Sequence, residues 1–215
     1  MESVLTEAVA LLDEAGASAL TFRALAQRLG GGVASIYWYV ASKDELLDRA
    51  TDHVMGAVFA DIEKFPPGDD PIDDLRAMAV TLFDAVVERP WLGAYFMRNT
   101  DVQSNSLRLY EKLGQQTLRL KLDARQRFHA VSAIVGVVVG SAVDMGQEPP
   151  QEILAGTVDR DEYLGRFART WRELDPADFP FVNEIVDEFD GHDDVDQFRS
   201  ALELTLTGLR LQAEA

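Results

Sequence analysis

The sequence predicts an all-α protein with a small N-terminal domain and a larger helical body. Apolar residues recur three and four positions apart along most of the chain, and no stretch shows strand alternation. Residues 65–71, FPPGDDP, place two adjacent prolines and a glycine where a helix cannot continue. A chain of 215 residues is long enough for two parts. We therefore expect domains at residues 1–64 and 72–215.

In the N-terminal domain, the first helix is expected over Glu2–Ala15 and is ended by Gly16. Thr21 can cap a second helix, whose apolar face has the spacing i, i+3, i+4 and i+7 from Phe22 to Leu29. Gly30–Gly32 supply the turn, because glycine reaches the left-handed backbone conformation without a side-chain clash. A short third helix follows over about Val33 to Tyr39.

A fourth helix is expected to begin after Ser42 and to run to about Lys64. Ser42-Lys43-Asp44-Glu45 reads as a capping box. In it, Ser42 caps the helix and Glu45 accepts the backbone N–H of Ser42. This long helix would connect the N-terminal domain to the body.

Helix, glycine turn and helix is the arrangement of a helix-turn-helix, whose second helix enters the major groove of DNA. The segments LTFRALAQRLG (Leu20–Gly30), SIYWYV (Ser35–Val40) and SKDELL (Ser42–Leu47) resemble the DNA-binding domain of the TetR family of transcriptional regulators. The resemblance is strong over about Val4 to Val58 and weak beyond. Gly32 departs from the family, which often caps the recognition helix with Ser or Thr.

The resemblance implies contacts to the DNA backbone from Arg23 and Lys43, at the two ends of the motif. It also implies that Val33, Ala34 and Ser35 begin the recognition helix. Val33 and Ala34 can offer only apolar contact, for instance to a thymine methyl, whereas the Ser35 hydroxyl can bond to base or phosphate.

Tyr37 and Tyr39 match positions that contact backbone or bases, and Trp38 and Ile36 are expected to pack inward. In the alternative interpretation, Tyr37 and Tyr39 fill a small core. Double-stranded operator DNA is the partner that this motif implies.

The charge of the chain argues against DNA binding. The net charge is −17, and residues 1–60 hold four basic side chains against eight acidic ones. A basic face is the usual footprint of a DNA-binding protein. Helix N-termini and hydroxyls can also hold phosphates. An all-α protein-interaction module that retains the helix-turn-helix head therefore stays open as the alternative function.

The body is predicted to be entirely helical. Helices are expected over Ile72–Glu88, Trp91–Met97, Ser104 to about Lys121, Ala124–Met145, one or two segments within 151–175, Phe181–Phe189, and Asp194 to about Leu211.

Two of these helices are predicted to form a homodimer interface. Ala130–Val143 is apolar nearly all round, and Gly136 and Gly140 would let another helix approach closely. The last helix carries an apolar seam with spacings of three and four. The expected interface residues are Val135, Val139, Phe198, Leu202, Thr205 and Leu209. The alternative is that both helices belong to the core of a monomer. A dimer would place two heads on successive major-groove turns and would favour a near-palindromic site.

Aromatic and methionine side chains gather in the first half of the body. The family resemblance implies a site there for a small-molecule effector, although for any one of these residues a place in the ordinary core is the favoured interpretation. The candidates are Met78, Phe83, Trp91, Tyr95, Phe96 and Tyr110. The effector itself cannot be named from the sequence.

Metal and enzyme chemistry find no support. His53, His129 and His192 are isolated, and DEFDGHDDVD lacks the spacing of a calcium loop. The absence of cysteine excludes disulfides and zinc fingers and suits a reducing cytoplasm. No leader is expected, and Ala130–Val143 is too short and glycine-rich to span a bilayer. We expect a cytoplasmic regulator without cofactor, enzymatic activity or membrane contact. The family resemblance favours a repressor over an activator.

Overall fold

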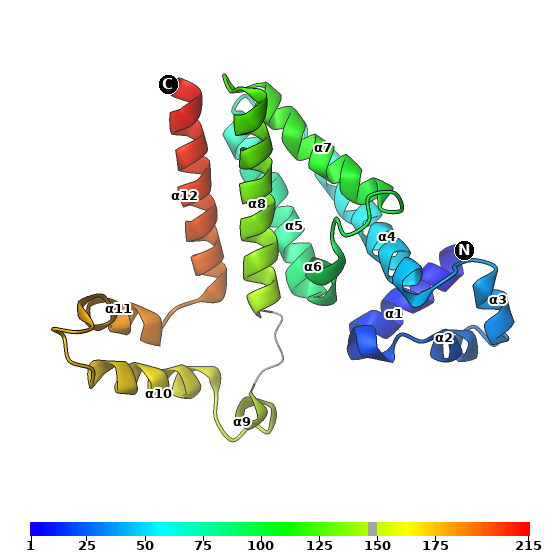
Figure 1. The fold of residues 1–215 in the computed structure, drawn as a ribbon, viewed down its shortest axis with the longest axis horizontal. Coiled ribbons are helices and arrows are strands. Elements are labelled where there is room, and N and C mark those ends of the chain that lie inside the picture. Colours follow the sequence, from blue (N-terminus) through cyan, green and yellow to red (C-terminus); the bar gives the residue numbers. More distant parts are fainter. Residues whose placement is uncertain (146–149) are drawn as a thin grey trace. The chain divides into compact units, whose positions relative to one another are not determined.

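The computed structural model describes residues 1–145 and 150–215, and every regular element in that part of the chain is a helix (Figure 1). The described residues form two compact units. The first combines the N-terminal part of the chain, as far as α8, with residues 201–215, and the second lies between them in the sequence.

The head of the first unit consists of α1 (Glu2–Ala19), α2 (Phe22–Arg28), α3 (Val33–Tyr37) and the start of α4 (Lys43–Glu63). Its core is apolar and includes Leu12, Leu25, Ile36 and Leu46, each at most 1% exposed. The backbone of Gly16 has φ 70° and interrupts α1 where the sequence predicted its end, but the chain resumes helical geometry as far as Ala19.

The caps of α2 and α4 form largely as predicted. Thr21 Oγ1 accepts the N–H of Ala24 at 3.1 Å, and Ser42 Oγ accepts the N–H of Glu45 at 3.1 Å. Glu45 Oε2 accepts the N–H of Ala41 at 2.8 Å, so the expected bond to the N–H of Ser42 is wrong by one residue. That backbone bond, followed by Arg49, lowers the pKa of Glu45. Gly30 has φ 66°, as the turn after α2 requires.

The body of the first unit contains α5 (Pro71–Glu88), α6 (Trp91–Tyr95), α7 (Ser104–Leu118) and α8 (Ala124–Met145). The predicted domain boundary at 65–71 covers most of the connection between α4 and α5 and the first residue of α5, Pro71. Helix α4 leaves the head and packs against α5 and α7, and α8 packs on α5, α6 and α7 (Figure 1). The buried core of the body includes Leu75, Leu82, Phe83, Leu113 and Ile134.

The first unit is completed by the later part of α12 (Asp194–Glu214). Two sets of ion pairs attach it to α5 and to Asp70, the residue that caps α5. Arg210 Nη2 lies 2.6 Å from Asp70 Oδ2, and Arg76 bonds to Glu203. The side chains of Leu202, Leu206 and Leu209 are buried beside these pairs along the helix.

The second unit contains α9 (Gln151–Leu154), α10 (Arg160–Arg172), α11 (Pro180–Asp190) and the first residues of α12. Helices α10 and α11 pack against each other. The rings of Trp171 and Phe189 stack with centroids 4.2 Å apart, and Arg172 pairs with Asp187 and Asp190.

Helix α8 has its predicted bounds, Ala124–Met145, and extends at both ends beyond the apolar run 130–143 that was judged too short to span a bilayer. With 22 residues and a mean hydropathy of 1.7, it is long and apolar enough to cross a membrane. No other helix in the described part of the chain meets both conditions. It packs against three helices of the body, yet only 22% of its apolar window is buried. Its open side is an apolar patch of the kind that marks an interaction surface.

Candidate functional site

The short helix α3 presents most of its side chains to solvent. Val33 is 37% exposed, Tyr37 60%, Trp38 89% and Tyr39 42%, whereas Ile36 is 1% exposed. The Tyr37 ring meets the Phe22 ring edge-on at 4.8 Å, which holds it in place without enclosing it. The surface is therefore apolar, aromatic and open.

The prediction that Trp38 packs inward is wrong, and helix geometry explains why. Ile36 and Val40 lie four residues apart and are both buried, at 1% and 2% exposure. In a helical backbone such residues share one face, so the residue midway between them lies on the opposite side. Trp38 continues the helical geometry at the end of α3, with φ −70° and ψ −20°, and points away from the core.

The beginning of α3 is also exposed. Ala34 and Ser35 are open to solvent, as is Gly32 before them. Ser35 Oγ donates a hydrogen bond to the carbonyl oxygen of Gly32 at 2.6 Å. Its proton is thus used within the turn, and its lone pairs remain available as acceptors.

Most cations of the head and α4 are held by carboxylates of the same chain. Arg28 pairs with Glu14 and Glu7, Arg49 Nη2 lies 2.8 Å from Glu45 Oε1, and Lys64 Nζ lies 2.6 Å from Asp61 Oδ1. Arg23 and Lys43 are exposed and, within the described residues, form no ion pair. The two cations that the resemblance assigned to DNA are thus the two left without a carboxylate.

Two aspartates on α4 attach the head to the body. Asp48 is 4% exposed and accepts hydrogen bonds from Arg98 Nε at 2.9 Å and Asn99 Nδ2 at 3.2 Å. One turn later, Asp52 Oδ1 accepts the backbone N–H groups of Asn105 at 2.7 Å and Ser106 at 3.1 Å, which caps α7.

A third aspartate, Asp13 of α1, makes a similar link. It accepts Trp91 Nε1 at 2.7 Å and Arg89 Nε at 3.2 Å. The sequence predicted no role for the three aspartates. Two acids four positions apart within the apolar stripe of α4 were the available signal for Asp48 and Asp52.

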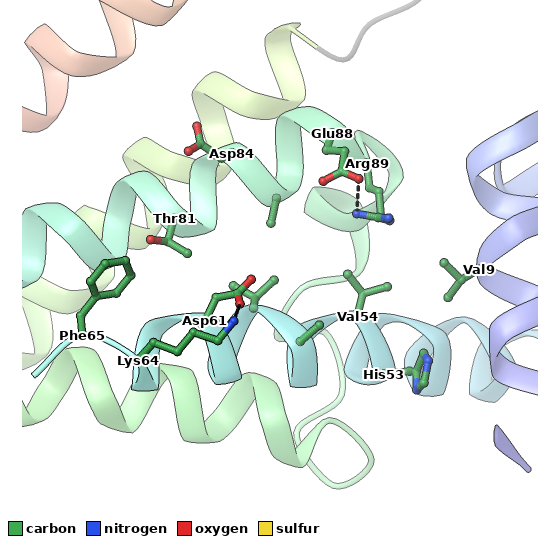
Figure 2. Close-up of a pocket in the computed structure, with 13 residues that line it drawn as sticks. Val9, His53, Val54, Asp61, Lys64, Phe65, Thr81, Asp84, Glu88 and Arg89 are labelled. Carbon is green, nitrogen blue, oxygen red and sulfur yellow. Dashed lines mark hydrogen bonds and ion pairs between the residues drawn. The ribbon is translucent and has the colours of Figure 1, made fainter.

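A pocket of about 680 Å³ lies between α4 and α5, with one residue from α1 (Figure 2). We call it the α4–α5 groove; its lining is Val9, His53, Val54, Ala57, Val58, Asp61, Lys64, Phe65, Thr81, Asp84, Ala85, Glu88 and Arg89. Small aliphatic side chains form part of its wall, and charged groups stand around it (Figure 2). Glu88 and Arg89 pair at 2.9 Å, whereas Asp84 forms no ion pair with another described residue.

None of the six predicted effector residues lines the α4–α5 groove, and the structure does not bring the six together. Phe83 and Phe96 are buried at 2% and 8% exposure, and Trp91 is bonded to Asp13. Met78 lines a cavity of about 20 Å³. Tyr110 lines a separate groove of about 650 Å³ between α4 and α7.

Tyr95, the last of these six, belongs to the α6–α7 junction. Its carbonyl oxygen accepts Gln103 Nε2 at 2.8 Å, and the guanidinium carbon of Arg98 lies 4.8 Å from its ring centroid. The predicted effector residues are aromatic apart from Met78, whereas the α4–α5 groove is lined mainly by small aliphatic and charged side chains.

The predicted interface residues divide into two groups. Phe198, Leu202 and Leu209 are 1%, 1% and 5% exposed within a single chain, so we assign them to the core rather than to a partner. Val135, Val139 and Thr205 are half-buried. The exposed α8–α12 face consists instead of Phe128, Ala133, Gly136, Gly140 and Val143 on α8 and Leu204 and Leu211 on α12.

The α8–α12 face has room for another helix. Leu204 and Leu211 are 77% and 64% exposed, and a groove of about 260 Å³ lies between the two helices. A Cβ atom added at Gly136 or Gly140 would meet no heavy atom within 4 Å.

As for metal binding, the described residues contain no group of three or more His, Asp or Glu side chains placed to hold an ion.

Comparison with known proteins identifies the family. A family model for bacterial regulatory proteins of the tetR family matches residues 4–50, and one for the tetracyclin repressor-like C-terminal domain matches residues 66–213. An HTH-type transcriptional regulator from Saccharopolyspora erythraea is 37% identical over 93 residues, which are 43% of this chain and 38% of that protein. The HTH-type transcriptional repressor DrrR1 from Streptomyces coeruleorubidus is 25% identical over 98% of this chain and 77% of its own.

Among solved structures, the transcriptional regulator SCO7222, a TetR from Streptomyces coelicolor, is 35% identical with a TM-score of 0.79. That match covers 99% of this chain and 98% of the other. The family consists of transcriptional regulators, which are generally not enzymes. The chain belongs to the tetR family of bacterial regulatory proteins, and it is a DNA-binding transcriptional regulator.

Proposed function

We propose that the protein is a cytoplasmic repressor that binds a near-palindromic operator as a homodimer and releases it when a small molecule binds. The observation that carries the proposal is the surface of α3. Its aromatic side chains are open to solvent, and the two head cations without a carboxylate partner, Arg23 and Lys43, lie at the two ends of the same motif. Tyr37, Tyr39 and Ser35 add hydroxyls for phosphate contacts.

The α8–α12 face supports the homodimer. It combines exposed large apolar residues, such as Phe128 and Leu204, with Gly136 and Gly140, which allow close helix approach. Exposure of a face of this composition to water is unfavourable, and burial of the face against a second copy of the chain would lower the free energy. Two copies related by a twofold axis would present two heads to successive turns of the DNA groove.

The α4–α5 groove is our proposed effector site. Its wall includes Val54, Ala57 and Val58 of α4, the helix that also carries the end of the recognition motif. A ligand that contacts these side chains would favour one position of α4 relative to α5. Asp48 and Asp52 join the same helix to the α6–α7 region, so a shift of α4 would change the spacing of the two heads in a dimer.

Selection of bound fragments from the source genome tests this proposal. Purified protein would be compared with the double variant Tyr37→Ala/Lys43→Ala at low and near-physiological salt. Lys121→Ala is a matched control, because Lys121 is also an exposed lysine but lies outside both the motif and the α4–α5 groove. We expect a few palindromic sites that both wild type and control recover and the double variant loses.

Failure to enrich any site at either salt would overturn the proposal. The net charge of −17 would then favour the alternative, a helix-turn-helix head used for protein contact. Once an operator is available, linkage provides a second test. Ligand and operator must weaken each other's binding by the same factor. An effector whose affinity is unchanged by saturating operator would refute the release mechanism.

A further inference from the structure

The recognition helix of this protein lacks the side chains that usually read base edges through hydrogen bonds. Residues 33–40 are Val-Ala-Ser-Ile-Tyr-Trp-Tyr-Val, without arginine, lysine, asparagine, glutamine or any acid. Arg or Lys pairs with guanine, Asn or Gln with adenine, and Asp or Glu with cytosine. This surface can make none of these pairings, so specificity must come from other contacts.

The start of α3 is the part that a helix-turn-helix presents to base edges. Val33 is 37% exposed and Ala34 is open to solvent, and both offer only methyl groups. The next residue, Ser35, has already donated its proton to the carbonyl oxygen of Gly32 at 2.6 Å. The turn before them consists of glycines without side chains. Two small apolar side chains thus form the tip of the reading surface.

In the major groove, the apolar feature that distinguishes one base from another is the C5 methyl group of thymine. The groups around the tip are suited to the DNA backbone instead. Arg23, Lys43 and the hydroxyls of Tyr37 and Tyr39 can hold phosphates, which fixes orientation but carries no sequence information. The exposed amide of Gln27 lies on α2, the helix that crosses the backbone in this motif.

We propose that the protein reads its operator through thymine methyl groups, which Val33 and Ala34 contact in the major groove. The inference rests on the proposed operator binding and names the chemistry of that recognition. Each buried methyl group contributes a factor of about four in affinity, so one contact discriminates weakly. Selectivity then depends on several thymines in each half-site and on both heads binding together.

Substituted operators test the inference with the full-length protein. In operators that the genomic selection recovers, each thymine would be replaced in turn by deoxyuridine, which keeps the base pair but lacks the methyl group. Binding would be measured by fluorescence anisotropy. We expect affinity to fall about fourfold at each contacted thymine. Replacement of guanine or adenine by its 7-deaza analogue, which removes the N7 acceptor, should leave affinity unchanged.

The variant Val33→Ala assigns the contact. It shortens an exposed side chain at the start of a helix, a change that the fold should accept. At the thymine that Val33 contacts, the variant should bind thymine and deoxyuridine operators with nearly equal affinity. At the other thymines it should retain the wild-type discrimination.

The outcomes separate this inference from the function on which it rests. Failure to recover any operator overturns the proposed function itself. An operator that is recovered, but is bound equally well with deoxyuridine throughout, overturns methyl readout alone. A loss of affinity confined to the 7-deaza substitutions would do the same, because it would show that a hydrogen-bond donor reads the N7 acceptor.

Discussion

Operator binding is expected to depend only moderately on salt, because the head has few cations to offer to phosphates. Arg23 and Lys43 are its only described cations without an ion pair, which gives four phosphate-neutralising groups in a dimer. Each neutralised phosphate contributes about −0.9 to the slope of log K against log salt. The expected slope is therefore about −3.6, and affinity should fall about 150-fold between about 50 and 200 mM salt.

The variant Lys43→Ala removes one cation from each head. Its slope should flatten to about −1.8, and the loss of affinity over the same salt range should shrink to about 12-fold. Lys121→Ala should keep the wild-type slope, because Lys121 lies outside the head and outside the α4–α5 groove. Fluorescence anisotropy of a labelled operator at four or more salt concentrations measures all three slopes.

A wild-type slope steeper than about −6 would refute this reasoning, because it would require phosphate contacts from cations that the structure places in ion pairs. An unchanged slope for Lys43→Ala would show that this lysine does not neutralise a phosphate. Hydroxyl contacts from Tyr37 and Tyr39 are neutral and cannot account for a steeper slope.

Three further predictions concern assembly and stability. Gly136→Glu should yield a folded monomer in analytical ultracentrifugation, whereas the control Gly114→Glu on α7 should stay dimeric. Both variants should fold, because a Cβ atom at either glycine meets no heavy atom within 4 Å in one chain. A dimeric Gly136→Glu variant would exclude α8 from the interface. Asp48→Ala should lower the free energy of unfolding in urea by about 2–3 kcal/mol, because a buried acceptor of several hydrogen bonds is lost. Arg76 lowers the pKa of Glu203, so this pair stabilises the fold above the pKa of an unfolded glutamate and is lost as pH falls through the lower folded pKa. Glu203→Gln should therefore unfold in urea with a weaker dependence on pH below about 4.5, and an unchanged dependence would contradict this role.

The helix-turn-helix could be predicted in detail because its signals are local. The caps at Thr21 and Ser42 and the glycine turn after α2 depend on residues a few positions apart in the chain. The side chains that face the core follow from helical spacing. Trp38 was expected to pack inward together with Ile36, whereas the buried positions of Ile36 and Val40 place Trp38 on the opposite side.

The proposed effector site and the exposed α8–α12 face were harder to predict, because both depend on which helices pack against each other. The seam of α12 was correctly identified as apolar, but Phe198 and Leu202 are buried within one chain. The apolar residues that remain exposed to a partner can be recognised only when the residues of the core are known. The α4–α5 groove combines residues from three helices and has few aromatic members. Periodicity within one helix contains no information about such a combination.

The three tryptophans of the chain are Trp38, Trp91 and Trp171. Trp38 is on the recognition surface, Trp91 is bonded to Asp13 where α6 meets α1, and Trp171 stacks on Phe189 in the second unit. Each indole therefore reports on a different part of the protein. Variants that keep one tryptophan and replace the other two with phenylalanine would give three native fluorescent probes, which respond separately to the arrival of DNA, to movement between head and body, and to changes in the second unit.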